Sequence, residues 1–470
     1  METTALDRVL DRYKLPFTPH GYQSDCVLEL APMDRAGLYA EVGCGKTVMS
    51  TLLALIWGGG EDAVVMVVMP PILLTSWRRW LESVGNVDGI LVYKGSPKER
   101  AALPVRQAKW VLCSMQIFKN DFERLRRELH GKRVIGIVDE ATSIKNVGSD
   151  NHRKVALFFD GHKLMLLTGT PLSTPGDAYA YIKLVSSGIY RSKTQFENIH
   201  VEERDFFNNI VKWRNLELMN QNLMLNSIRV LKEDVLKHLH SPVYVPLHYE
   251  LDDSHLALYR TLAEEQVLLL EQGGKIDATS APRLYTALQQ IVVNWDYFSG
   301  DDKVRPAILD VIDNVVEEIG LGKEGASKLL IFANYKLTNR KLMTYLQKYK
   351  PAVFYSEISP AKQAEHVDRF LNDPECLVAI ANPLSAGMGL NFQGVCWEVL
   401  FVEEPIVPKD FHQAVGRVYR DGQQHVPTVR LAIAEGTIQH RLHANLLEKD
   451  ALVNRVQRGF QDLREAIHGR

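Results

Sequence analysis

Short apolar runs alternate with stretches of helical periodicity over the first 180 or so residues of the chain. The runs are bounded by glycine, proline or polar turns and lie at 37–40, 63–69, 110–114, 134–138 and 163–168. Strands that alternate with helices are typical of a parallel sheet in an α/β domain. The sequence therefore predicts an α/β lobe over residues 1–187 with helices flanking its sheet.

A second series of the same kind begins near residue 328. Its expected strands lie at 328–332, 352–355, 377–381, 398–402 and 428–432. The part between the two series is richer in helical periodicity. We therefore expect a helical insertion and linker over 188–245, and a second α/β lobe over 246–470 that begins with a helical entry segment.

Composition and charge narrow the function classes. The chain has 470 residues, of which 46% are hydrophobic and 24% are charged, as is ordinary for globular domains. Its formal net charge of −2 gives no global attraction to nucleic acid, so such binding requires a local basic surface. The five cysteines form no CxxC pair, and no secretory signal or membrane-spanning run occurs. We expect the reducing cytoplasm of a bacterium or of a phage-infected host, and no membrane partner.

The segment AEVGCGKT at 40–47 has the spacing of a phosphate-binding loop. Gly43 and Gly45 allow backbone N–H groups to turn toward phosphate oxygens, and the N-terminus of the following helix favours negative charge. Lys46 is expected to reach the β- and γ-phosphates of ATP, and Thr47 to bind Mg²⁺. The alternative is a plain glycine turn before a helix.

Two adjacent carboxylates, Asp139 and Glu140, follow the apolar run at 134–138. Ligands bind at the carboxyl edge of such sheets, so we expect Asp139 to hold the Mg²⁺ shell and Glu140 to orient or deprotonate the attacking water. Taken alone, two adjacent carboxylates after a strand are usually a solvated turn. A third strand end, LTGT at 167–170, follows by one helix.

The segment QAVGRVYR at 413–420 offers two arginines, Arg417 and Arg420, which we expect on one face of a helix. Placed at the γ-phosphate, an arginine accelerates phosphoryl transfer strongly. The alternative is a solvated surface helix. Upstream, the glycine-containing segment 385–391 suits close approach to a phosphate of the nucleotide or of a bound strand.

Together these motifs resemble superfamily-two helicases and, within them, the Swi/Snf-like DNA translocases. DEATSIKN at 139–146 and SIRVLKEDVL at 227–236 are similar to elements of that group, and so are LQQIVVN at 288–294 and KLLIFANY at 328–335. The chain departs from the group at Thr142, where a histidine is usual, and at Ile228, where an arginine is usual.

The resemblance implies two RecA-like lobes, ATP and Mg²⁺ as cofactors, and DNA as the partner. It implies that Gln23 reads adenine and that Gly387, Gly389 and Gln413 contribute to the nucleotide site. The nucleic-acid contacts that it implies are Pro70, Ser76, Trp77, Ser114, Gln116, Lys145, Asn146, Asn334, Ser385 and Asn391. For Trp77 the alternative is a core position in an amphipathic helix.

Three functions are consistent with these features. The first is an ATP-dependent translocase on double-stranded or branched DNA, with migration of forks or Holliday junctions as one form of it. We expect this translocase to act as a monomer because one chain holds a whole ATP site. The second is a conventional strand-separating helicase on DNA or RNA, which needs a pin that the sequence does not identify. The third is a DNA-binding module switched by ATP without movement. Protein loading partners are not indicated.

Overall fold

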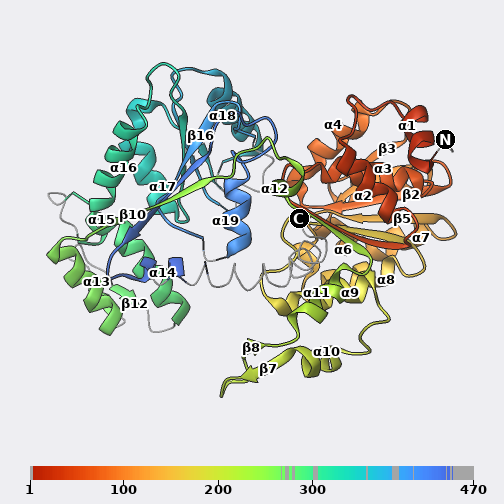
Figure 1. Ribbon diagram of the computed structural model, residues 1–470, viewed down its shortest axis with the longest axis horizontal. Helices are drawn as coiled ribbons and strands as arrows, with labels where there is room; N and C mark the ends of the chain where they lie inside the picture. The colour runs from red at the N-terminus through yellow and green to blue at the C-terminus, as the bar shows by residue number, and fades with distance from the viewer. Residues whose placement is uncertain are drawn as a thin grey trace, which may run out of the picture. The chain divides into compact units, whose positions relative to one another are not determined.

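The computed structural model describes residues 4–265, 267–269, 275–277, 281–299, 305–355, 358–383, 391–405, 407–440, 442–444 and 447. The described chain forms two compact units, which meet in the sequence between Val235 and Leu236. Each unit contains a parallel sheet with helices on both faces (Figure 1), so the predicted fold class is confirmed. Within the described residues, no helix has the length and apolar character needed to cross a membrane.

The first unit is organised by a seven-stranded sheet of order β3-β4-β2-β5-β6-β1-β9, in which every neighbouring pair is parallel. Its strands are β1 (Arg35–Ala40), β2 (Ala63–Met69), β3 (Ile90–Tyr93), β4 (Trp110–Ser114), β5 (Arg133–Val138), β6 (Lys163–Leu167) and β9 (Ser227–Val230). All side chains of β2 are buried because helices cover both faces of a parallel sheet.

Two apolar clusters form the core of this unit, one on each face of the sheet. The helices of one face are α1 (Ala5–Arg12), α2 (Gly21–Leu30), α3 (Lys46–Ile56) and α4 (Leu74–Ser83). Those of the other are α6 (Met115–Asn120), α7 (Phe122–Glu128), α8 (Asp150–Phe158), α9 (Ala178–Val185) and α11 (Leu216–Met224). The clusters hold the strand ends of the sheet in fixed positions.

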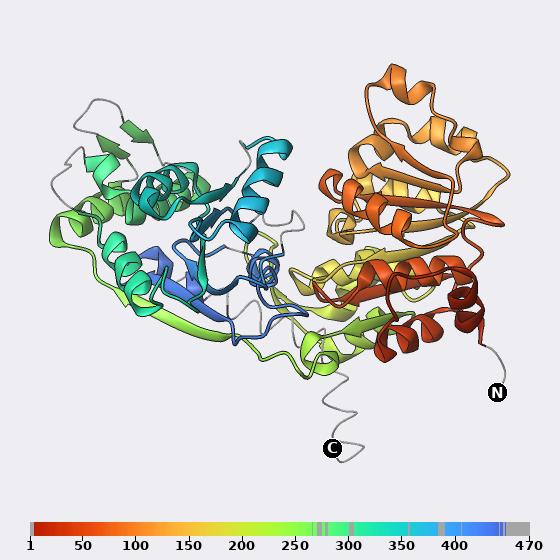
Figure 2. The ribbon, with the colours of Figure 1, turned by 90° about the horizontal axis from the view of Figure 1, so that it is seen from above.

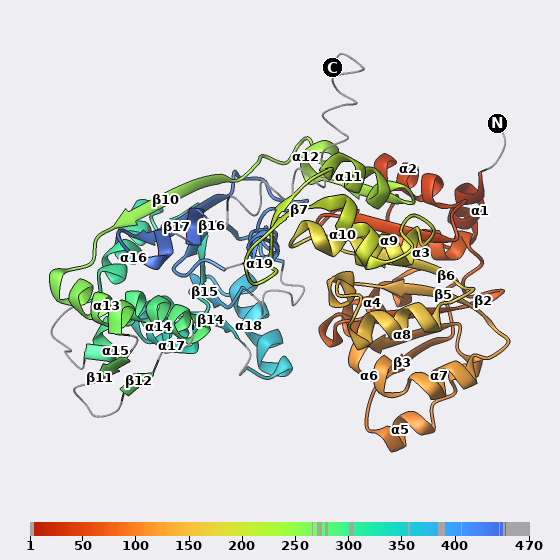
Figure 3. The ribbon, with the colours of Figure 1, turned by 90° about the horizontal axis from the view of Figure 1, so that it is seen from below.

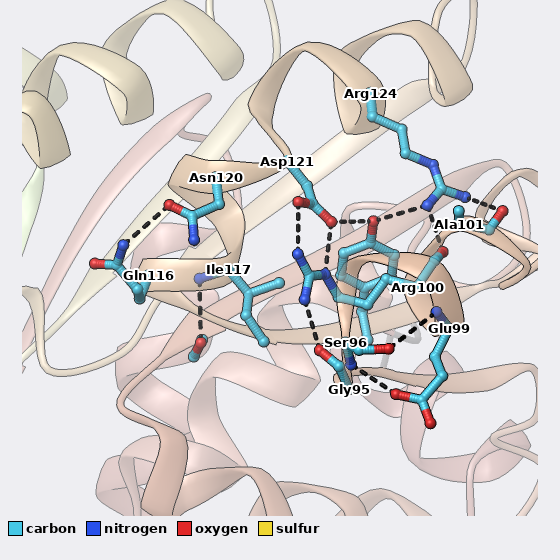
Figure 4. A network of polar contacts seen from close by, with 12 residues as sticks. Gly95, Ser96, Glu99, Arg100, Ala101, Gln116, Ile117, Asn120, Asp121 and Arg124 are labelled. Atoms are coloured by element: carbon cyan, nitrogen blue, oxygen red, sulfur yellow. Dashed lines mark hydrogen bonds and ion pairs between the residues drawn. The ribbon is translucent and has the colours of Figure 1, made fainter.

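A buried ion pair fixes the outer edge of this sheet. Arg100 in α5 (Pro97–Ala101) donates from Nε and Nη2 to the two carboxylate oxygens of Asp121, at 2.7 and 2.8 Å (Figure 4). The Tyr93 hydroxyl donates to the same carboxylate at 2.7 Å. The Arg100 hydrogen bonds lower the pKa of Asp121, so the pair stays ionised. This contact joins β3 and α5 to the helices that follow β4.

The second unit is organised by a six-stranded sheet of order β10-β17-β16-β13-β15-β14, again parallel throughout (Figures 2 and 3). Its strands are β10 (Val243–Tyr249), β13 (Lys328–Phe332), β14 (Ala352–Phe354), β15 (Val378–Ala381), β16 (Cys396–Phe401) and β17 (Thr428–Ala434). One face packs on α13 (Asp253–Glu265), α14 (Ala281–Val293), α16 (Ala307–Glu318) and α17 (Lys336–Tyr345), and the other on α18 (Pro360–Asn372) and α19 (Pro408–Val415).

The segment 188–245 is less helical than expected. It contains α10 (Lys193–His200) and α11, but also a hairpin of β7 (Val201–Arg204) and β8 (Ile210–Trp213), and then β9 and α12 (Lys232–Val235). Apolar residues at 228, 231 and 235 imitate a helical period. The open edge of β1 nevertheless provides backbone partners, since the Glu41 N–H donates to the Val230 carbonyl at 3.0 Å. This segment therefore supplies a strand to the first sheet, and β10 supplies one to the second.

Candidate functional site

The phosphate-loop segment joins the end of β1 to the start of α3. Gly43 has φ 95° and Gly45 has φ 77°, so the turn uses the left-handed region that glycine occupies without strain. A Cβ at Gly45 would also lie 2.1 Å from Gln23 Nε2, which is too close for any side chain. The loop therefore requires glycine there and opens directly onto the N-terminus of α3, where anions are favoured.

Lys46 and Thr47 form the first turn of α3. The Lys46 ammonium donates to the carbonyls of Ala40 and Glu41, at 2.8 and 3.3 Å. These neutral acceptors belong to the loop itself, and phosphate oxygens are stronger acceptors for an ammonium. The position of Lys46 fits the expected phosphate contact, which remains a prediction.

Gln23 in α2 lies against this loop. It is buried, its Oε1 accepts from the His20 N–H at 3.0 Å, and its Nε2 donates to the Cys44 carbonyl at 3.4 Å. The Tyr22 hydroxyl donates to the same carbonyl at 3.2 Å. The fold thus brings Gln23 into contact with the phosphate loop, and its expected role in reading adenine remains a prediction.

Asp139 and Glu140 lie at the carboxyl end of β5, as expected. The Asp139 carboxylate is buried and accepts from the Glu140 N–H at 2.8 Å and from the Trp77 indole N–H at 2.8 Å. Burial, and then the neighbouring Glu140 carboxylate, raises the pKa of Asp139 to about 6. Glu140 itself has φ 50°, a left-handed conformation that costs a non-glycine residue free energy and often occurs at functional sites.

Trp77 lies in the core and not on the surface expected for a nucleic-acid contact. It is only 2% exposed, because α4 directs Trp77 and Leu81, four residues apart, toward the sheet. This is the alternative considered for Trp77 from the sequence. The sequence did not indicate that its indole would donate to the Asp139 carboxylate.

The oxygen atoms of two side chains at this edge are suitable ligands for a magnesium ion. The Thr47 hydroxyl and the Asp139 carboxylate are hard oxygen ligands of the kind that Mg²⁺ binds together with substrate phosphates. Each Asp139 oxygen accepts one N–H, which leaves a second lone pair on each. In the described part of the chain, no group of three or more His, Cys, Asp or Glu side chains could hold a metal.

Arg229 of β9, which directly follows the departure at Ile228, connects the end of β1 to the turn that follows β6. Its guanidinium donates to the Tyr39 carbonyl at 2.9 Å and to the Gly169 carbonyl at 2.7 Å. The Glu41 carboxylate accepts from the Lys232 N–H at 2.9 Å. The ends of β1, β6 and β9 are therefore held together by side chains of the loop and of the segment that leads to the second unit.

In the second unit, α19 ends at Val415, so the expectation that Arg417 and Arg420 share one face of a helix is wrong. The N–H of Arg417 donates to the Ala414 carbonyl at 3.1 Å, so the chain leaves the α-helix in tighter turns. Arg417 is 5% exposed, and the Arg420 guanidinium donates to the Asn391 side chain. Gln413 lies in the last turn of α19 and is partly buried.

The expected nucleic-acid residues of the first unit fall into two groups. One group is partly or fully exposed on turns and helix starts at the carboxyl edge of the sheet, and it contains Pro70, Ser76 and Asn146. Gln116 is also exposed, and its side chain donates to Asn120 at 3.0 Å (Figure 4). Ser114, in contrast, is 3% exposed and caps α6 by accepting from the Ile117 N–H. Ser114 thus has a structural role, and the exposed residues remain predicted contacts.

Lys145 and Asn334 are engaged within their own units. The Lys145 ammonium donates to Ser173 Oγ at 2.9 Å and lies 3.6 Å from the Asp177 carboxylate. The Asn334 side chain donates to the Glu404 carbonyl at 2.9 Å. A bound strand would compete for both groups. Ser385, Gly387 and Gly389 lie outside the described residues.

Glu403 is a buried carboxylate that the sequence analysis did not select. It is 1% exposed and accepts from the N–H groups of Asn334 and Tyr335, at 2.7 and 3.0 Å, and from the Thr338 hydroxyl at 2.6 Å. Burial raises its pKa to about 7. An apolar strand followed by two carboxylates, the pattern of Asp139 and Glu140, recurs at 398–404 and could have revealed it.

Residues 26–295 match the SNF2-related domain, and residues 310–422 match the helicase conserved C-terminal domain. The chain is 24% identical over 517 residues to the TATA-binding protein-associated factor MOT1 of Saccharomyces cerevisiae, over 92% of this chain and 27% of that protein. It is 23% identical over 496 residues to the DNA annealing helicase and endonuclease ZRANB3 of Bos taurus, over 99% of this chain and 43% of that protein. The chain thus spans less than half of either relative.

A solved structure shows the same fold. The helicase domain of Pyrococcus furiosus Hef covers 91% of this chain and 98% of its own, with a TM-score of 0.54 and 16% sequence identity. At this identity the likeness concerns the fold alone.

We expect Trp77→Phe to lower kcat for ATP hydrolysis by roughly 10- to 100-fold, the usual effect of removing a group that orients a metal ligand. The ring volume is largely kept, but the Asp139 carboxylate loses one of its N–H donors. Steady-state ATPase assays measure the effect. The matched control is Trp80→Phe on the same helix, whose indole donates to the Thr51 hydroxyl at 2.9 Å. Equal effects of the two changes would show that the bond to Asp139 has no special role.

Proposed function

The chain belongs to the SNF2-related family of superfamily-two helicases and is an ATP-dependent enzyme, and we propose that it uses ATP to move along double-stranded or branched DNA. The observation that carries the proposal is the convergence of chemistry at one sheet edge. The phosphate loop after β1, the Thr168–Thr170 turn after β6 and the carboxylates after β5 follow three adjacent strands. Ligands of open α/β sheets bind at this edge.

Each residue of this edge has a distinct proposed role. Lys46 would leave the loop carbonyls and bind the β- and γ-phosphates, with the loop N–H groups around them. Thr47 and Asp139 would hold Mg²⁺, which neutralises phosphate charge when it is bound. Glu140 would orient the attacking water and accept its proton. The buried surroundings of Asp139 strengthen all of these charge interactions.

The second unit would supply the arginines. Arg417 and Arg420 follow α19 in tight turns, and a guanidinium that reaches the γ-phosphate stabilises the charge of the transition state. Because these arginines and the phosphate loop belong to different units, hydrolysis would be linked to movement of one unit relative to the other. In such a cycle, each unit would make and release its contacts with the phosphates of a bound strand in alternation.

Double-stranded or branched DNA is the substrate that we favour. The likeness to a relative whose name includes DNA annealing helicase supports DNA as the substrate, although the chain covers only 43% of that protein. A binding module that ATP merely switches is less well supported, since it has no need of a water-orienting carboxylate or of arginines at the γ-phosphate.

We expect Glu140→Gln to bind ATP and DNA but to hydrolyse ATP at least about 100-fold more slowly, because loss of general-base catalysis costs roughly 10²–10⁴-fold. Single-turnover hydrolysis and nucleotide binding, measured side by side, test this. Lys46→Ala is the matched variant and should lose nucleotide affinity as well. Near-normal turnover by Glu140→Gln would exclude Glu140 as the base.

Movement itself is tested by displacement of a triplex-forming strand from a DNA duplex. A translocase should displace the strand only when ATP is hydrolysed, and Glu140→Gln should not displace it. If the wild-type protein hydrolyses ATP on the duplex but leaves the third strand in place, the switched binding module replaces the translocase as the better account.

A further inference from the structure

Two phenylalanines are exposed at the tip of the hairpin formed by β7 and β8. The hairpin projects from α10 and α11 in Figure 1. Phe206 is 96% exposed and Phe207 is 80% exposed, and their ring centroids lie 5.4 Å apart with planes at 86°. Adjacent exposed aromatic rings are unfavourable in water, and such surfaces mark sites of interaction.

The tip is held in shape by its own hydrogen bonds. The Asp205 carboxylate accepts from the backbone N–H groups of Phe207 and Asn209, at 2.9 and 2.8 Å, and from the Asn209 side chain at 2.9 Å. These bonds, led by that from the Asn209 side chain, lower the pKa of Asp205. The turn is thus preorganised to present both rings outward.

Several charged side chains near the tip are engaged in ion pairs or in the turn, whereas Glu203 is exposed. Arg204 pairs with Glu197 of α10 at 3.0 Å, Lys212 pairs with Glu202 at 2.6 Å, and the Asp205 carboxylate is used by the turn. The tip therefore presents two aromatic rings and the amide of exposed Asn208. These groups suit nucleobases, which stack on aromatic rings and bind amides at their edges, and they do not suit phosphates.

The root of the hairpin is tied to the edge of the sheet that carries the ATP chemistry. The Trp213 ring packs so closely on Gly176 that a Cβ there would lie 2.9 Å from it. Gly176 belongs to the turn Pro175–Asp177, and Asp177 pairs with Lys145 of the segment that follows Glu140. The hairpin is thus fixed to elements that directly follow the acidic and Thr-Gly-Thr motifs.

We propose that Phe206 and Phe207 form a wedge that stacks on unpaired bases at the branch point of a DNA fork or junction. Aromatic and apolar side chains inserted between base steps unstack them, and a rigid hairpin allows a motor to drive DNA against such a wedge. The inference rests on the proposed function, because it takes DNA as the substrate. In that function the wedge would act where the moving enzyme meets the branch point of its DNA.

The first test measures base unstacking without turnover. A fork carries 2-aminopurine at the branch point, and its fluorescence is recorded with the full chain and a non-hydrolysable ATP analogue. Fluorescence should rise with the wild-type protein and with Val211→Ala, a control on the same hairpin whose side chain is 56% exposed. It should stay near that of free DNA with the double variant Phe206→Ala, Phe207→Ala, and equal signals from all three proteins would overturn the proposal.

The second test measures ATP-driven fork remodelling. We expect the double variant to be at least about tenfold slower than wild type, given the usual contribution of a base–aromatic stack, while its thermal unfolding stays unchanged because both rings are exposed. If the wild-type protein neither remodels forks nor shows DNA-stimulated ATPase activity, the proposed function fails. The fluorescence test still decides separately whether the tip contacts bases.

The third test identifies the occupant of the tip directly. A photoreactive phenylalanine analogue in place of Phe206 should cross-link to the fork at the branch point. Absence of any cross-link to DNA at saturating fork concentration would overturn the proposal. Cross-linking to a second copy of the chain would also overturn it and would assign the tip to a protein contact.

Discussion

The buried carboxylate of Asp139 is the constraint on which the arrangement of the first unit depends. A carboxylate taken out of water is costly unless N–H groups or cations replace its hydration. Here the N–H groups of Glu140 and Trp77 do so, and the pKa of Asp139 still rises to about 6. A cation bound beside this carboxylate would therefore be favoured. Through these two hydrogen bonds, α4 and the left-handed turn at Glu140 are both joined to this carboxylate at the end of β5.

Other polar contacts extend this organisation away from the nucleotide edge. Arg229 joins a carbonyl in the last residues of β1 to one that follows β6, and Lys145 joins the segment after the acidic motif to the turn on which Trp213 packs. In the second unit, Glu403 has a comparable position, holding the start of α17 against the end of β16.

Patterns that depend on neighbouring residues were predictable from the sequence. Continuous apolar runs identified β1, β2, β4, β5 and β6 because both faces of a parallel strand are buried, and the spacing of GCGKT fixed the turn into α3. Patterns decided by distant residues were not. The sequence could not show that Trp77 would face Asp139 across 62 positions, or that β1 would leave an edge open for β9.

Local end effects explain the remaining differences. In the sequence, the helical periodicity continues past Val415 to Arg417. The helix α19 nevertheless ends at Val415 and the chain continues in tighter turns, which only the backbone hydrogen bonds show. The sequence does not mark Phe206 and Phe207 as exposed, because two consecutive apolar residues ordinarily belong to a core. It is the bonding of Asp205 within the turn that places them outside.

The most direct test of the account is steady-state ATP hydrolysis at one fixed salt concentration, without nucleic acid and with single-stranded DNA, duplex DNA, a four-way junction or RNA. The account predicts the strongest stimulation by duplex or junction DNA. Strongest stimulation by single strands or by RNA would contradict a duplex translocase and favour a conventional strand-separating helicase.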